Sequence, residues 1–469
     1  MFLYGFFLCI GVIEAIRNDE TFMKVPELIA HYGYRSEEHQ VNTEDGYVLG
    51  VHRIPIGRDE RPAPFSPHKR PVVLLMHCLL CDSSVFVMNL PAQSLGNLYK
   101  CHSLRKHSIL ESSLCLGFVL ADAGFDVWMA NTRGNEYGMN HTRLKVKEKS
   151  FWNFTWYEHS RYDLKNTVEY VLNVSKQEDL YYIGHSQGTL IMFARLAEDP
   201  AFNSKGSFSQ NLSGLVRAFF GMGPIGGLST SIPILYLASF PLYIVTEEAV
   251  KILSGVPIDV PRFLKRMIAN FCSVDLMSIF CNLFLRSVGM GTEQLSQFNN
   301  SRWDVFVSHL PSPSSALNLL HWAQVMRFHE LRKLDFGTSR NMEIYGQKQP
   351  PLFNLSMITT PMHIFWSSDD TLAPSVDVQE HIIRKLGSAL KGSYALSHFT
   401  HIDFILGLRA TEDVYVPIIR LIYKDLAERA GKASRICLSI WKGGIAPSEG
   451  YYKIRGEHGG VTCFTIVSV

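Results

Sequence analysis

The chain has 469 residues, of which 46% are hydrophobic and 19% are charged, and its formal net charge is +2. A chain of this length and apolar content can bury a large core, which excludes an intrinsically disordered protein. Acidic and basic residues are interspersed, so the sequence provides no basic surface of the kind that binds nucleic acid or another polyanion. We expect one large domain that carries an insertion, or two domains.

The first fifteen residues have the pattern of a targeting segment. An apolar block runs from Phe2 to Ile13 and is followed by charged residues that begin at Arg17. This block is shorter than the roughly 20 residues that span a bilayer, so residues 1–15 are predicted to be a cleaved signal peptide rather than a membrane anchor. Passage through the secretory pathway also fits six Asn-x-Ser/Thr sequons, at Asn140, Asn153, Asn173, Asn211, Asn299 and Asn354.

The nine cysteines do not form a recognisable metal site. Cys78 and Cys81 have the spacing of a zinc-ligand pair, but neither a second pair nor a nearby histidine completes a tetrahedral set. In an oxidising compartment Cys272 and Cys281 are the best-placed pair for a disulfide, which would close a short loop. The alternative is that these two are small buried hydrophobic residues. We predict no metal and no cofactor.

The first part of the chain alternates predicted strands and helices. Residues 22–60 indicate a helix and then a hairpin whose turn is at 43–46. Two uninterrupted apolar runs, 71–76 and 125–130, are typical of parallel strands that are buried on both faces. Between them a helical pattern ends at Gly124, a residue type that commonly terminates helices. This alternation predicts an α/β fold with a doubly wound, mostly parallel sheet.

Residues 181–190 contain the motif Gly184-x-Ser186-x-Gly188 between an apolar run and a helical pattern. The order strand, tight turn, helix predicts that Ser186 occupies a sharp, strained turn above the edge of the sheet. The two glycines allow the strand and the helix to approach closely. A serine hydroxyl presented in this way is a nucleophile elbow, so Ser186 is the candidate nucleophile.

The character of the sequence changes between residues 215 and 322, where apolar helical segments such as 232–245 and 267–288 are interrupted by Gly and Pro. Such strongly apolar segments predict a helical cap or lid over a hydrophobic pocket. The alternative is that they are ordinary core helices. We therefore expect a signal peptide, a first core part, a cap, a second core part and an atypical extension, at residues 1–15, 22–214, 215–322, 323–430 and 431–469.

The second core part supplies candidates for an acid and a base. A predicted strand at 362–366 is followed by Asp369 and Asp370, and a later short strand is followed by His398 and His401. Ester cleavage by a serine needs a base that takes the hydroxyl proton and a carboxylate that orients the base. In α/β-hydrolases the chain order is Ser, acid, His, which this sequence follows. The residues alone leave the choice within each pair open.

Five short motifs are distributed over residues 25–427: Gly184-His185-Ser186-Gln187-Gly188-Thr189, His401-x-Asp403-Phe404, Asn131-x-Arg133-Gly134-Asn135, Thr43-Glu44-Asp45-Gly46-Tyr47 and His321-Trp322. Together they resemble the acid lipase family, which includes gastric lipases and lysosomal acid lipase. The resemblance implies an α/β-hydrolase core with a cap and lid over an acyl pocket. It also implies activity on triacylglycerols or sterol esters. From the signal peptide we expect a secreted or lysosomal location.

The same resemblance implies roles for particular residues. It places the acid on Asp370 and the base on His401, with Ser186 as nucleophile. The backbone N–H groups of Leu79 and Gln187 would form the oxyanion hole. The cap disulfide of the family corresponds to Cys272 and Cys281.

One departure from the family pattern lies in the oxyanion loop. Cys78 stands where the family has Gly after His77. If the loop needs a positive φ at residue 78, Cys78 is strained and the Leu79 N–H is misaimed. On that basis we expect reduced activity, and we expect Cys78→Gly to be faster than the parent.

Two further segments depart from the family. Residues 97–117 have no counterpart, and joining Gly96 to Phe118 restores the expected helix. They are either a retained intron or gene-model error, or a surface loop with a Cys101–Cys115 bridge. Residues 431–469 continue past the family's usual end without clear periodicity, and we expect them to pack poorly and to be dispensable.

The leading hypothesis is a lipase that binds a lipid–water interface and cleaves lipid esters. One alternative is a soluble carboxylesterase for short acyl chains, which would show no jump in activity above the solubility limit of its substrate. A second is a catalytically impaired lipid-binding protein on the same fold. The intact order of serine, acid and histidine argues against the second alternative.

Overall fold

The computed structural model describes residues 18–58, 70–90, 115–200, 202–203, 214–228, 246–272, 279–281, 297, 299–429, 457–458 and 461–462. Several sequence predictions fall outside these residues: the signal peptide, Asn211, Cys101, residues 97–114 of the atypical insertion, the apolar segment 232–245 and most of 431–469.

One central sheet has the strand order β1-β2-β4-β3-β6-β7-β10-β11, and β5 pairs with β2. The strands are β1 (Glu37–Asn42), β2 (Tyr47–Ile54), β3 (Val72–Met76), β4 (Asp126–Met129), β5 (Asn140–His141), β6 (Leu180–His185), β7 (Val216–Met222), β10 (Met362–Ser367) and β11 (Leu390–Leu396). Strands β1, β4 and β5 run antiparallel to β2, and the remaining neighbours are parallel. This arrangement confirms the predicted α/β, mostly parallel sheet. The direction of strand addition reverses at β3, which brings the segments after β3 and β6 together at the carboxyl edge.

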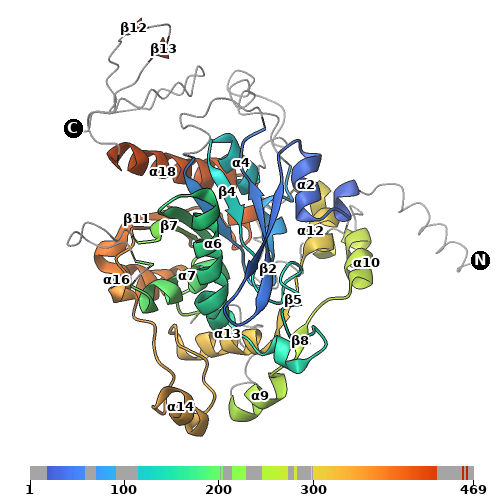
Figure 1. The fold of residues 1–469 in the computed structure, drawn as a ribbon, viewed down its shortest axis with the longest axis vertical. Helices are drawn as coiled ribbons and strands as arrows, with labels where there is room; N and C mark the ends of the chain where they lie inside the picture. The colour runs from blue at the N-terminus through green and yellow to red at the C-terminus, as the bar shows by residue number, and fades with distance from the viewer. Residues whose placement is uncertain are drawn as a thin grey trace, which may run out of the picture.

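Helices cover both faces of this sheet (Figure 1). The longer ones are α2 (Val25–His31), α4 (Leu116–Asp122), α6 (Lys165–Ser175), α7 (Gln187–Glu198), α9 (Thr246–Leu253), α10 (Arg262–Cys272), α12 (Trp303–His309), α13 (Ala316–Phe328), α14 (Thr338–Tyr345) and α18 (Val416–Arg429). Short helical segments include η1 (Asp19–Thr21), η3 (Ser83–Phe86), α15 (Ser375–Asp377), η9 (Val378–Ile383), α16 (Arg384–Leu386) and α17 (Asp403–Leu406). In the parts of the chain given above, no helix is both long and apolar enough to cross a membrane.

The hydrophobic core lies in two layers, one on each face of the sheet. Leu74 of β3 belongs to a cluster with residues of α6 and α7, such as Val168 and Leu190. Its neighbour Leu75 belongs to a second cluster with residues of α4 and α18, such as Phe118. Because successive side chains of a strand point to opposite faces, a central strand covered on both sides must be apolar at every position. This is why the unbroken apolar run of β3 predicted its place.

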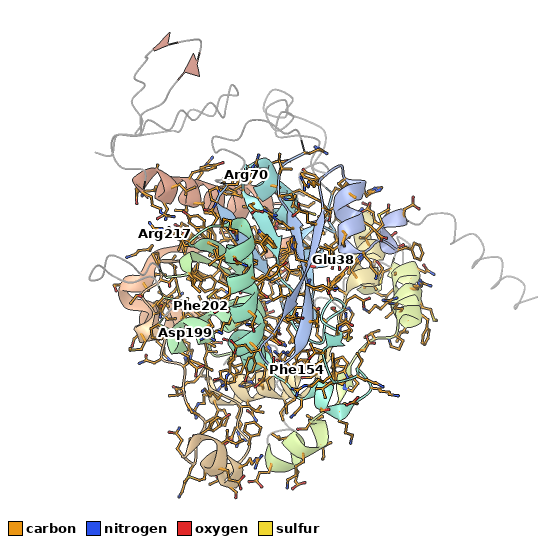
Figure 2. The ribbon with its side chains drawn as sticks, viewed as in Figure 1. Glu38, Arg70, Phe154, Asp199, Phe202 and Arg217 are labelled. Atoms are coloured by element: carbon orange, nitrogen blue, oxygen red, sulfur yellow. A yellow bond between two sulfur atoms is a disulfide. The ribbon has the colours of Figure 1, made fainter. Side chains whose placement is uncertain are left out.

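The boundary of the cap was predicted too early. Residues 216–222 form β7, which lies between β6 and β10 in the central sheet. Its Arg217 binds Asp425 of α18, with Nε 2.9 Å from Oδ2, which ties the strand to the outer helix layer (Figure 2). The run Val216–Met222 is short and apolar, and such a run does not distinguish a buried strand from part of a helix. The helices α9, α10 and α12 follow β7 and lie beside the sheet rather than on it (Figure 1).

The end of the atypical insertion is part of the core. Cys115 precedes α4, is 1% exposed and donates a hydrogen bond from Sγ to the Asn89 carbonyl, at 2.9 Å. It is a free thiol, so the alternative Cys101–Cys115 bridge is not formed. The predicted helix that ends at Gly124 is α4, and Gly124 has the expected positive φ of 92°.

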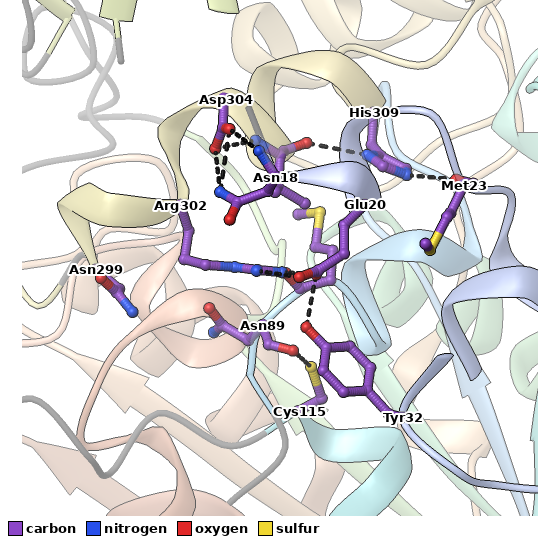
Figure 3. A network of polar contacts seen from close by, with 12 residues as sticks. Asn18, Glu20, Met23, Tyr32, Asn89, Cys115, Asn299, Arg302, Asp304 and His309 are labelled. Carbon is purple, nitrogen blue, oxygen red and sulfur yellow. Dashed lines mark hydrogen bonds and ion pairs between the residues drawn. The ribbon is translucent and has the colours of Figure 1, made fainter. Parts of the chain in front are cut away.

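A buried polar network joins the segment before α2 to the helix α12 (Figure 3). The Arg302 guanidinium donates to the Glu20 carboxylate, with Nη1 2.7 Å from Oε1, and to the Met88 carbonyl. The Tyr32 hydroxyl donates to the same carboxylate at 2.6 Å. The Asn18 amide donates to the Asp304 carboxylate at 3.0 Å, two residues beyond Arg302 in the chain. The Asn18–Asp304 and Glu20–Arg302 contacts connect residues more than 280 positions apart in the chain.

Candidate active site

Ser186 lies at the turn between β6 and α7. Its φ of 54° and ψ of −116° are sparsely populated for a residue with a side chain, and it is 4% exposed. A Cβ on Gly188 would lie 2.5 Å from the Met76 carbonyl oxygen, so only glycine allows α7 to start this close to β3. The local prediction of a strained serine turn with close backbone approach is confirmed.

Asp370 and His401 form a buried pair. His401 Nδ1 lies 2.8 Å from Oδ2 and 3.1 Å from Oδ1 of Asp370, and the two residues are 4% and 1% exposed. The backbone N–H groups of Leu372 and Ala373 donate to Asp370 Oδ1 and hold the carboxylate in place. With Nδ1 directed at this carboxylate, Nε2 is the ring nitrogen left to accept a proton from a nucleophile.

The two rejected neighbours lie in different surroundings. Asp369 accepts a hydrogen bond from the His398 backbone N–H at 2.9 Å, and the two side chains are 38% and 57% exposed. They stand beside the buried pair in the chain but face solvent. Of the two acids and two histidines left open by the residues alone, the structure therefore buries and pairs Asp370 with His401.

Two residues that the sequence analysis did not single out for a role support this pair. A Cβ on Gly223, at φ 51° just after β7, would lie 3.2 Å from both Asp370 Oδ2 and His401 Nδ1. Its lack of a side chain makes room for the acid and the base. His185 Nε2 donates to the His401 carbonyl at 2.8 Å and so fixes the loop that carries His401. Burial and the nearby His401 lower the pKa of His185 well below its usual range, so His185 acts here as a neutral donor.

The prediction that Cys78 is strained is wrong. Cys78 does not have a positive φ; the left-handed residue of this loop is Leu80, at φ 56°. Cys78 forms a disulfide with Cys81. The spacing of the two cysteines was the available signal, because Cys-x-x-Cys suits a short disulfide as well as a zinc-ligand pair. The disulfide between Cys272 and Cys281 agrees with the prediction, and their Cα atoms are 5.9 Å apart.

The two candidate oxyanion donors follow adjacent strands. Leu79 comes after β3, and Gln187 is the first residue of α7. The Gln187 side chain is 2% exposed, and its Oε1 accepts hydrogen bonds from Trp322 Nε1 at 2.7 Å and from Asn318 Nδ2 at 3.1 Å. Both donors belong to α13. The His321-Trp322 motif thus contributes a direct contact to the residue after the nucleophile.

The motif Asn131-x-Arg133-Gly134-Asn135 holds the start of the oxyanion loop. The Asn135 amide donates to His77 Nε2 at 3.2 Å, which leaves the ring proton on Nδ1 for donation to the Cys78 carbonyl, at 2.8 Å. Asn131 Oδ1 accepts from the Ser83 backbone N–H at the start of η3. Arg133 binds Asp163 through Nε, at 2.9 Å, and anchors the motif in the core.

Most predicted sequons lie on the surface. Asn140, Asn153, Asn173 and Asn354 are exposed, as a glycan requires. Asn299 is only 6% exposed and its Oδ1 accepts from the Ser301 hydroxyl, so this position is a poor attachment site for a bulky glycan.

Comparisons with known proteins show the family of this chain. The family model of the partial α/β-hydrolase lipase region matches residues 25–90, and the family model of the α/β hydrolase fold matches residues 101–233. The chain is 35% identical over 419 residues to human lysosomal acid lipase/cholesteryl ester hydrolase, covering 88% of this chain and 94% of that protein. It is 34% identical over 431 residues to lipase lipl-5 of Caenorhabditis elegans (91% and 98%), and 34% identical over 420 residues to mouse lipase member K (88% and 94%).

The sheet, the serine turn and these matches define an α/β-hydrolase. At this identity and coverage the chain belongs to the acid lipase family, and it is a carboxylic ester hydrolase of the lipase type.

Proposed function

We propose that this enzyme cleaves carboxylic esters of lipids, namely triacylglycerols or sterol esters, through an acyl-enzyme on Ser186. The observation that carries the proposal is the buried Asp370–His401 pair beside the serine turn. The substrate class follows from the relatives, one of which is described as a cholesteryl ester hydrolase. The cap would bind the lipid–water interface, and the leader and surface sequons support a secreted or lysosomal location.

The proposed reaction has two steps, formation of the acyl-enzyme and its hydrolysis. Ser186 Oγ attacks the ester carbonyl while His401 Nε2 takes its proton, and Asp370 keeps the imidazole in the required tautomer and stabilises the imidazolium. The backbone N–H groups of Leu79 and Gln187 donate to the oxyanion of the tetrahedral intermediate. His401 then returns the proton to the departing alcohol. Water repeats the sequence on the acyl-enzyme and releases the fatty acid.

The first prediction tests the nucleophile and the substrate together. The parent and Ser186→Ala are compared on emulsified triolein and cholesteryl oleate between about pH 4 and pH 8. We expect the parent to hydrolyse at least one of them and Ser186→Ala to lose about 10⁴-fold or more of kcat. Equal activity of the two proteins would overturn the mechanism.

The competing functions are separate outcomes of the same experiment. Activity that is confined to short soluble esters, with no rise above their solubility limit, would identify a carboxylesterase. A parent that binds lipid but hydrolyses none of these esters would identify an impaired lipid-binding protein.

A further inference from the structure

The loop between β3 and η3 is closed by a disulfide across the candidate oxyanion residue. Cys78 and Cys81 are joined with their Cα atoms 5.2 Å apart, and only Leu79 and Leu80 lie between them. The cysteines are 5% and 6% exposed and pack into the core cluster that contains β3. Leu79 and Leu80 are half-buried. The cross-link therefore anchors both ends of the segment that presents the Leu79 N–H.

Without the cross-link, few interactions would hold the backbone of this segment in its conformation. Leu80 has φ 56°, a conformation that residues with a side chain disfavour and that persists only where the surroundings impose it. Beside the cross-link, Leu79 packs against the core, and two hydrogen bonds hold the loop: His77 Nδ1–H donates to the Cys78 carbonyl at 2.8 Å, and the Ser312 N–H donates to the Leu80 carbonyl at 2.7 Å. A four-residue ring leaves few backbone conformations besides the one observed.

The loop also starts directly against the serine turn. Met76, at the end of β3, pairs with Gly184 of β6. The place of a Cβ on Gly188 lies 2.5 Å from the Met76 carbonyl oxygen and 3.1 Å from that of His77. A backbone shift at residues 78–81 would therefore change the position of the Leu79 N–H relative to Gln187 rather than move both together. Oxyanion stabilisation is sensitive to such shifts because the donors must be aimed before the reaction.

We propose that the Cys78–Cys81 disulfide is a positioning element of the oxyanion hole, which takes over the role that the family assigns to glycine after His77. The inference rests on the proposed function, in which Leu79 is a donor. It reverses the expectation drawn from the sequence: Cys78→Gly breaks the cross-link and slows the enzyme.

The test compares the parent with Cys78→Ala/Cys81→Ala on a soluble p-nitrophenyl ester. We expect kcat to fall about 10- to 100-fold with little change in KM, since complete loss of one oxyanion donor costs about 10² to 10³. The affinity for an alkyl boronic acid, which forms a tetrahedral adduct with the serine, should weaken by the same factor as kcat/KM. Active sites are counted by burst titration, so that a misfolded fraction is not mistaken for a slower site.

Cys272→Ala/Cys281→Ala is the matched control, since it removes the second disulfide found among the described residues, which lies in the region predicted as a cap. It should keep kcat on the soluble ester and the boronic acid affinity within about two-fold of the parent. A Cys78→Ala/Cys81→Ala enzyme whose kcat per active site stays within two-fold of the parent would overturn the inference.

If Cys78→Ala/Cys81→Ala does not fold, the control variant provides a second route. The Cys78–Cys81 disulfide of this variant is reduced with dithiothreitol, which is oxidised to its cyclic disulfide, and the reduction of this pair is followed by mass spectrometry of alkylated peptides. We expect kcat to fall on reduction and to return on reoxidation, and an unchanged kcat in the reduced enzyme contradicts the inference. An inactive parent, or a Ser186→Ala variant as active as the parent, refutes the proposed function instead.

Discussion

Asp369 and Asp370 are adjacent in the chain, yet their carboxylates have different surroundings. Asp370 is 1% exposed and contacts a buried imidazole, whereas the side chain of Asp369 is 38% exposed. An electrostatic contact is much stronger away from solvent, where water does not screen it. A carboxylate that orients a catalytic base must therefore be the buried one.

The second prediction follows from this difference. Asp370→Asn keeps the size of the side chain but no longer enforces the tautomer of His401, so we expect kcat to fall by about 10⁴. Asp369→Asn is the matched control and should change kcat by less than about two-fold. Both are measured on a soluble ester. Comparable losses in the two variants would contradict the assignment of the acid.

The third prediction concerns Asp403, two residues beyond His401. Burial raises its pKa to about 6, against hydrogen bonds from the Thr400 hydroxyl and N–H that lower it, and the charge of Asp370 raises it further. The folded state thus holds this proton more tightly than the unfolded chain does, whose ordinary value is 3.8. The stability that the protonated group contributes is complete below about pH 4 and is lost as the pH rises to about 6.

Asp403→Asn mimics the protonated form at every pH. Between pH 4 and pH 7 we expect the free energy of unfolding of the variant to gain about 3 kcal/mol relative to the parent. Urea unfolding at the two pH values measures this difference, and Asp369→Asn is the control. Parallel pH dependence in Asp403→Asn and the parent would show that burial does not hold the proton.

At the scale of elements, α13 contacts the start of α7. Asn318 and Trp322 are four positions apart and so lie on one face of α13, from which both donate to Gln187 Oε1. The side chain of Gln187, whose backbone N–H is a candidate oxyanion donor, is thereby held by α13. The helix α13 thus contributes to the geometry of the site.

The fourth prediction removes one of these donors. Trp322→Phe keeps an aromatic ring but loses the N–H, so we expect kcat to fall about two- to ten-fold, the value of one hydrogen bond. In a Gln187→Met background the same substitution should have no further effect. Trp366→Phe, whose Nε1 donates to the Ser393 hydroxyl on β11, is the matched control. Equal effects of Trp322→Phe with and without Gln187 would rule out the proposed contact.

At the scale of the whole molecule, the network of Figure 3 connects the beginning of the described chain to the start of α12. Arg302 is 2% exposed and Glu20 is 6% exposed, so neither charge is compensated by water. Such a pair adds little net stability over an apolar pair, but removal of one partner leaves a buried charge alone. The arrangement therefore makes the segment before α2 dependent on α12 and the reverse.

The fifth prediction tests this dependence. Arg302→Leu should lower the free energy of unfolding by about 3–5 kcal/mol, and Glu20→Leu in addition should recover part of the loss. Arg340→Leu, which breaks the exposed pair with Glu343, should cost less than about 1 kcal/mol. Urea midpoints at neutral pH give all three values. A double variant that is no more stable than Arg302→Leu would refute the pairing.

The sequence alone predicted the features that depend on short-range pattern. The continuous apolar runs of β3 and β4, the hairpin of β1 and β2 and the turn at Ser186 were all found where they were expected. Each is encoded within about ten consecutive residues, because strand burial and backbone strain act locally. Chain order also brought the candidate serine, acid and histidine into one hypothesis, and the family motifs chose between adjacent candidates.

The tertiary structure decided what depends on residues far apart in the chain. The apolar run of β7 joined the sheet because β6 and β10 flank it, which no local pattern encodes. The Cys78–Cys81 disulfide is by contrast a local feature, since the two cysteines are only three positions apart, and it shows that the residue that departs from the family pattern is bonded rather than strained. Gly223, His185 and Asn318 gained their contacts from the packing of separate elements. Local sequence determines which backbone conformations are favourable, and only packing determines which side chains meet.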